Sequence, residues 1–110
     1  MQTYIFRGRY NADAIKGMMA NPEDREAVLA KIFAKVGGKL LAYYMTFGED
    51  DFVFIAECPD NHTVLSLSIL GTAGGSVSDL KTAAAMTSKE AMAAFKNAGA
   101  LAGSFKSAGR

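Results

Sequence analysis

A short acidic turn joins two apolar runs near the middle of this 110-residue chain. The runs are Lys39–Phe47 and Phe52–Cys58, and one glycine and three acids, Gly48–Asp51, lie between them. Both runs are rich in aromatic and aliphatic residues, and four residues are a normal length for a hairpin connection. We therefore expect a central β-hairpin whose tip is Gly48–Asp51.

The remaining segments predict two more strands and the helices between them. Thr3–Tyr10 and Val77–Met86 fit strands, whereas apolar residues recur at helical spacing elsewhere. The expected helices are a short one around Ile15–Met19, a longer one with Asn21 as N-cap and Gly37-Gly38 as stop, one over His62–Leu70, and one opened by the capping box Thr87–Glu90. This order predicts an α+β, ferredoxin-like βαββαβ fold with a four-stranded antiparallel sheet, helices on one face and a C-terminal helix. We expect one domain over residues 1–110, with about 100–110 as a flexible tail.

Both sides of the expected hairpin are apolar. Strict alternation divides its first strand into Leu40, Ala42, Tyr44 and Leu41, Tyr43, Met45, and its second into Phe52, Phe54, Ala56 and Val53, Ile55. Helices can cover only one side, and a large apolar sheet exposed to water is rare in monomers. We therefore expect a second copy of the chain to cover the free side in a twofold homodimer.

Composition narrows the partners and the location. A formal net charge of +1 provides no basic field for nucleic acid or a membrane surface. The single Cys58 cannot close an internal disulfide, and no His or Cys cluster predicts a metal site. No apolar run reaches the roughly 18 residues of a membrane span, and Arg7 interrupts the first apolar stretch too early for a signal peptide. We expect a cytoplasmic protein without cofactor or metal.

Several segments, in their order and spacing, carry a resemblance to a known family. They are Thr3-Tyr4-Ile5, Asn21–Arg25, Gly37–Leu40, Tyr43-Tyr44, Gly48–Val53, Glu57–Asp60 and Thr87–Glu90. With these segments the chain resembles the GYD domain family of the dimeric α+β-barrel superfamily. In that family a tyrosine precedes the aspartate of the hairpin, and here Asp50 takes the tyrosine's place before Asp51.

The resemblance implies the fold and dimerisation but no activity. Relatives in the superfamily include cofactor-free monooxygenases, haem-degrading enzymes, isomerases and stress-induced proteins, so the fold does not decide between them. Two hypotheses follow. The first is a homo-oligomeric protein that binds a small ligand in the cleft between sheet and helices. The alternative is a cofactor-free monooxygenase-like or isomerase-like enzyme acting on a small aromatic substrate.

Five polar residues are candidates for lining such a cleft: Tyr43, Tyr44, Asp51, Arg25 and Lys81. One of the two tyrosines should face the helices and the other the dimer cleft, and which does so stays open. Arg25 stands in a first helical turn, where a cation opposes the helix dipole, so we expect it to form an inward salt bridge or an anion site. Asp51 fits either a structural role, with turn amides or Arg25 as partners, or a role in a site.

The other reactive residues have simpler interpretations. His62 is the only histidine and fits an exposed first helical turn better than a haem ligand or a general base. Cys58 fits a buried strand end, Glu57 a structural corner, and Asp60 a helix cap. The sequence thus contains no catalytic triad, metal cluster or phosphate-binding loop.

Overall fold

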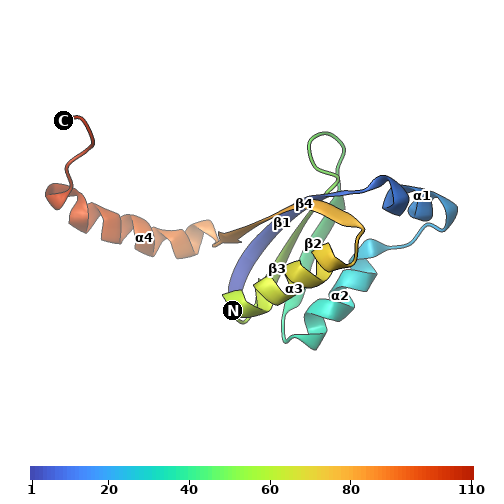
Figure 1. Cartoon of the computed structure of the whole chain (residues 1–110). Helices are drawn as coiled ribbons and strands as arrows, with labels where there is room; N and C mark the ends of the chain where they lie inside the picture. The colour runs from blue at the N-terminus through green and yellow to red at the C-terminus, as the bar shows by residue number, and fades with distance from the viewer.

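The computed structural model describes all 110 residues and contains four strands and four α-helices (Figure 1). In chain order these are β1 (Gln2–Tyr10), α1 (Ala12–Ala20), α2 (Arg25–Lys35), β2 (Lys39–Met45), β3 (Phe52–Cys58), α3 (Asn61–Ala73), β4 (Val77–Ala85) and α4 (Ser88–Leu101), followed by a 3₁₀ turn at Ala102–Ser104. None of these helices combines the length and the apolar character that a membrane crossing requires.

The four strands form one antiparallel sheet in the order β2-β3-β1-β4. Ile5 marks its centre, opposite Ile55 of β3 on one side and Ala83 of β4 on the other. This strand order, with β1 and β3 inside, is the ferredoxin-like arrangement. The predicted α+β fold class is therefore confirmed.

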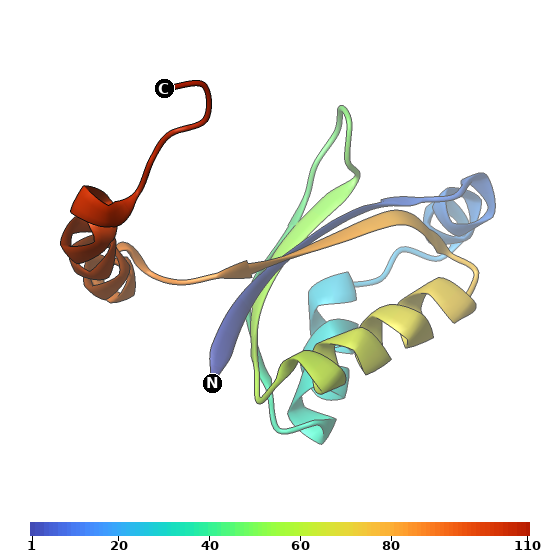
Figure 2. The same ribbon diagram turned by 60° about the vertical axis from the view of Figure 1, so that its left-hand side comes forward.

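Helices α2 and α3 lie on one face of the sheet, and nothing from the chain covers the opposite face (Figures 1 and 2). Side chains on β1 and β3 alternate between the two faces, as a pleated strand requires. The buried core consists of Tyr4, Phe6, Tyr10, Phe33, Phe52, Phe54, Ala56, Cys58 and Val64. Seven of these nine residues come from the two central strands, so the sheet supplies most of the core.

A bulge in β2 changes which of its side chains face the helices. Leu41 is an extra residue between the pairs that Leu40 and Ala42 make with β3. An extra residue reverses the parity of the strand beyond it. Tyr43 therefore lies on the helix side and Tyr44 on the free face, and the expected strict alternation through this strand is wrong.

The hairpin tip is held by hydrogen bonds to neighbouring strands. The Asp51 carboxylate accepts from the Tyr10 backbone N–H at 2.9 Å, and Asp50 pairs with Lys81 at 2.6 Å. Arg9 donates to two carbonyl oxygens of the turn. Asp50 and Asp51, two of the three acids of the tip, are thus engaged in structural contacts.

Helix caps follow the expected chemistry, with one shift. Thr87 and Glu90 form the predicted capping box at the start of α4. Helix α2 begins at Arg25 with Asp24 as its N-cap, so the expected cap at Asn21 is wrong. Asn21 instead ends α1. Asp and Asn rank equally as N-caps, and the helix begins after the later of the two.

Helix α4 and the residues after it, here called the arm (residues 88–110), project away from the body (Figures 1 and 2). No residue of α4 is buried, and Phe95 is 79% exposed. The radius of gyration is 17.8 Å, compared with about 13 Å for a compact chain of this length. The arm thus makes no core of its own with this chain.

Candidate functional site

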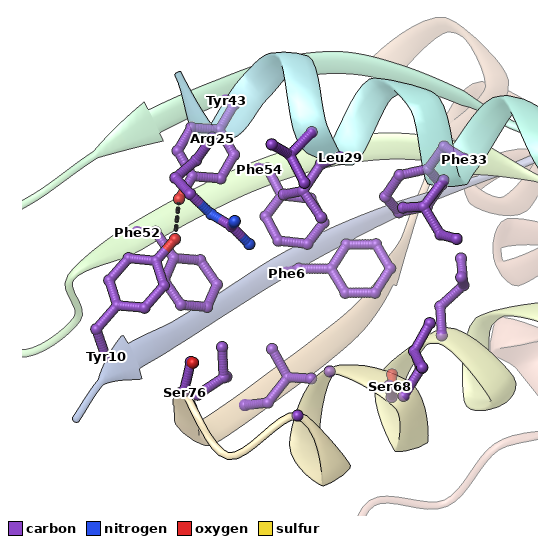
Figure 3. Close-up of a pocket in the computed structure, with 18 residues that line it drawn as sticks. Phe6, Tyr10, Arg25, Leu29, Phe33, Tyr43, Phe52, Phe54, Ser68 and Ser76 are labelled. Atoms are coloured by element: carbon purple, nitrogen blue, oxygen red, sulfur yellow. Dashed lines mark hydrogen bonds between the residues drawn. The ribbon is translucent and has the colours of Figure 1, made fainter. Parts of the chain in front are cut away.

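A cavity of about 380 Å³ lies between the core face of the sheet and helices α2 and α3 (Figure 3). It exists because α2 packs over β2 and α3 over β4 and β3, while no comparable contact joins the two helices. Of the 18 residues that line it, 13 are hydrophobic. Its volume and apolar lining are those of a small-molecule pocket.

The floor of the cavity is a set of stacked aromatic rings. The Phe54 ring lies 4.6 Å from Phe6, 5.8 Å from Tyr43 and 5.8 Å from Phe52, with all three planes within 22° of its own. A Cβ at Gly8 would lie 2.5 Å from the Phe52 ring, so glycine is needed for this ring to lie flat over β1. The result is a broad, flat apolar surface suited to another ring.

The walls come from the two helices. Leu29, Ile32 and Phe33 lie along α2, and Leu67 and Leu70 along α3. The α3 wall becomes thinner at its C-terminal end, because residues 71 and 74 are glycines. A Cβ at position 71 would meet no atom within 4 Å, which leaves open space at this point.

Two phenols and one guanidinium meet at one end of the cavity (Figure 3). The hydroxyls of Tyr10 and Tyr43 are hydrogen-bonded to each other. Arg25, the first residue of α2, extends its guanidinium over the aromatic floor beside them. Its Nη1 donates to the Glu23 carboxylate at 3.0 Å, whereas its Nε is closed off from water and has no acceptor.

Tyr43 and Arg25 keep their protons at neutral pH, because both have a raised pKa. Burial, and secondly the bond to Tyr10, raise the pKa of Tyr43 well above its usual value, and the nearby Arg25 charge offsets only part of this. Burial disfavours the charged form of Arg25, but its interactions with Tyr10 and Glu23 outweigh burial and raise its pKa. The end of the cavity therefore offers hydroxyl groups and one fixed positive charge.

The lining contains no carboxylate, imidazole or thiol. A proton-abstracting base needs a group that is unprotonated at the working pH, and Tyr43 is protonated there. The arrangement can therefore bind and orient a molecule through donors and apolar contact, but it supplies no general base.

The structure brings together two of the five candidate residues. Tyr43 and Arg25 line the cavity. Tyr44 is 65% exposed on the free face, and Asp51 and Lys81 belong to the hairpin contacts outside the cavity. Of the two structural partners considered for Asp51, Arg25 is not used: Arg25 binds Glu23, and Asp51 accepts from a backbone amide, that of Tyr10.

Three polar residues of the lining were not among the candidates: Tyr10, Ser68 and Ser76. A signal for Tyr10 exists, because it has the same parity on β1 as the apolar Tyr4 and Phe6. No comparable sequence pattern marks Ser68 and Ser76. They line the cavity because of the way α3 lies over the sheet, which the sequence pattern does not specify.

The other reactive residues lie apart from the cavity. His62 is exposed in the first turn of α3, and Cys58 is fully buried in the core. Asp60 caps α3 as expected, accepting from the Thr63 backbone N–H at 2.8 Å. No three His, Cys, Asp or Glu side chains gather closely enough to hold a metal ion.

Fold and cavity together define a class: an α+β protein of ferredoxin-like topology with an aromatic pocket under two helices. The particular family follows from comparison with known families, in which residues 4–95 match the GYD domain. The chain belongs to the GYD domain family. Searches of curated proteins and of solved structures gave no significant match. The family match ends within α4, so most of the arm lies beyond it.

Proposed function

We propose that this protein is a homodimer that binds a small, mainly apolar molecule in the cavity between the sheet and helices α2 and α3. The observation that carries the proposal is the cavity itself, with 13 hydrophobic residues among 18 and a floor of stacked rings. Empty apolar space of this size forgoes contacts that a bound molecule restores. Binding is favoured over the alternative of a cofactor-free enzyme because the lining offers no general base.

Fluorescence of N-phenyl-1-naphthylamine, a neutral apolar probe, tests the binding proposal. Wild-type protein should enhance its emission with saturable binding. The variant Gly71→Leu should weaken binding at least tenfold, because the new side chain enters open space in the cavity wall. Gly17→Leu is the matched control: it makes the same change in helix α1, also without a neighbour within 4 Å and outside this cavity.

Equal binding by Gly71→Leu and wild-type protein would place the probe elsewhere and contradict the proposal. Circular dichroism of both variants establishes that each remains folded. A folded wild-type protein that gives no saturable enhancement is a second contradicting result.

The dimer proposal rests on two apolar surfaces that the chain leaves bare. The free face of the sheet presents Ile5, Val53, Ile55 and the 65% exposed Tyr44. The arm presents four large apolar side chains, Met92, Phe95, Leu101 and Phe105, each at least 66% exposed. Surfaces of this kind mark protein interfaces.

Charge supports a second copy of this chain as the occupant. The arm carries four basic residues and one acid, a net charge of +3, and the whole chain has +1, so residues 1–87 carry −2. Opposite charges attract the arm of one copy to the body of another, where the apolar side chains of the arm become buried.

The single, buried Cys58 has no disulfide partner, which supports a reducing, cytoplasmic location.

Light scattering coupled to gel filtration tests this proposal. The full chain at micromolar concentration should have the mass of two chains, and Phe95→Glu should shift it toward one. Lys106→Gln, which removes a charge from the arm but no apolar surface, should remain dimeric at moderate salt. A wild-type mass of one chain contradicts the proposal.

A further inference from the structure

We propose that the ligand of this cavity is a flat aromatic acid with a single negative charge, and that its carboxylate binds Arg25. This inference rests on the proposed function, since it names the ligand class for the same cavity. It follows from the position of Arg25, from its unused donors and from the charge of the surroundings.

The position of Arg25 is not explained by helix stability. It is the first residue of α2, where a positive side chain opposes the helix dipole. Its side chain is only 28% exposed and lies along the cavity, with the guanidinium over the aromatic floor (Figure 3). A cation held over an apolar floor indicates a partner within the cavity.

The donors of Arg25 are only partly used. Nη1 binds Glu23, an exposed residue outside the cavity, and such a pair contributes at most about 1 kcal/mol. Nε is buried and unpaired. Most buried donors in proteins have an acceptor, and a guanidinium matches a carboxylate through two parallel N–H bonds. Nε thus has no acceptor within the protein, and a ligand carboxylate reaches this edge once the Arg25 side chain turns it toward the cavity.

The charges around the cavity favour a ligand with a single negative charge. No acidic residue lines the cavity, so a ligand carboxylate meets no repulsion from the lining. The hydrogen-bonded hydroxyls of Tyr10 and Tyr43 lie at the same end of the cavity and add polar groups there. A cationic ligand would be repelled by Arg25, and a doubly charged group such as a phosphate ester would leave one charge uncompensated in an apolar space.

The stacked aromatic rings of the cavity floor favour a ligand with a planar ring system. The ring planes of Phe52, Phe54 and Tyr43 lie within 22° of one another in all three pairs. A planar ring system stacks against such a surface better than a branched aliphatic chain does.

Isothermal titration with two isosteric probes, 2-naphthoate and the neutral 2-naphthamide, tests the inference. Wild-type protein should bind the acid about tenfold or more tightly than the amide, as expected for hydrogen bonds to a charged group. Arg25→Gln should lose this preference and still bind the amide. Arg25→Lys, which retains the charge but not the paired donors, should show an intermediate preference.

Lys31→Gln is the matched control, because it removes one positive charge from an exposed position on the same helix. It should retain the full preference for the acid. Equal affinity of wild-type protein for the two probes would overturn the anion inference and leave the binding proposal intact. Binding of neither probe by folded protein would overturn both. The wild-type comparison decides the matter even if an Arg25 variant does not fold.

Discussion

Replacing Tyr43 with phenylalanine should reduce the loss of stability that the protein undergoes in alkali. Tyr43 lies at the polar end of the cavity, where burial and the hydroxyl of Tyr10 raise its pKa. In the unfolded chain the same phenol has a pKa of about 10. Above that pH the unfolded state loses its proton while the folded state retains it, so the free energy of unfolding falls as pH rises.

The magnitude follows from the linkage relation. Between pH 10 and 11 the proton released by unfolded Tyr43 changes the free energy of unfolding by about 1 kcal/mol if the folded phenol remains fully protonated. Tyr43 is only half-buried, and solvent screening reduces the expected change to about 0.5 kcal/mol. Below pH 9 both states are protonated, and this contribution is constant.

Urea unfolding at pH 9, 10 and 11, followed by far-ultraviolet circular dichroism, measures the effect. Wild-type protein should lose about 0.5 kcal/mol more than Tyr43→Phe between pH 10 and 11. Tyr10→Phe should keep most of the wild-type dependence, because burial, the larger cause, persists. The same loss in wild-type protein and Tyr43→Phe would refute the placement of this phenol in the cavity.

Two substitutions and one chemical reaction test other parts of the fold. Gly38→Ala should lower the free energy of unfolding by about 1–3 kcal/mol in urea titrations, because its Cβ would lie 2.5 Å from the backbone oxygen of Glu57. Thr87→Ala should reduce the stability of α4 by about 1 kcal/mol, seen as faster amide exchange in that helix with no change in exchange of the sheet. Cys58 should react with a thiol reagent slowly in the folded protein and quickly in urea, since burial and the charge of Asp60 raise its pKa.

The sequence was sufficient to predict the fold because its signals are local and mutually consistent. The hairpin Gly48–Asp51, the stop at Gly37 and the capping box at Thr87 each specify a boundary, and the resulting order of strands and helices matches the ferredoxin-like pattern. The bulge at Leu41 escaped prediction, because apolar residues occupy both sides of β2 and no polar residue marks the change of face. For the same reason, the sequence did not show whether Tyr43 or Tyr44 faces the helices; the pairing of β2 with β3 decides it.

The candidate site was predicted only in part. The unfavourable position of Arg25 in a first helical turn was a usable signal, and Tyr43 belonged to the right strand. Asp51 and Lys81 were expected in the cleft because polar residues near a sheet suggest one, yet each has a closer partner at the hairpin. The cavity itself depends on the spacing of α2 and α3 over the sheet, which no local pattern encodes.

Amide chemical-shift mapping with neutral 2-naphthamide is the most direct test of ligand binding in the cavity between the sheet and helices α2 and α3. Binding in the cavity should give saturable shifts confined to the lining, with the largest at Leu29, Phe33, Leu67 and Gly71. Shifts concentrated instead on the arm or on the free face of the sheet, or no saturable shift at all, would contradict it.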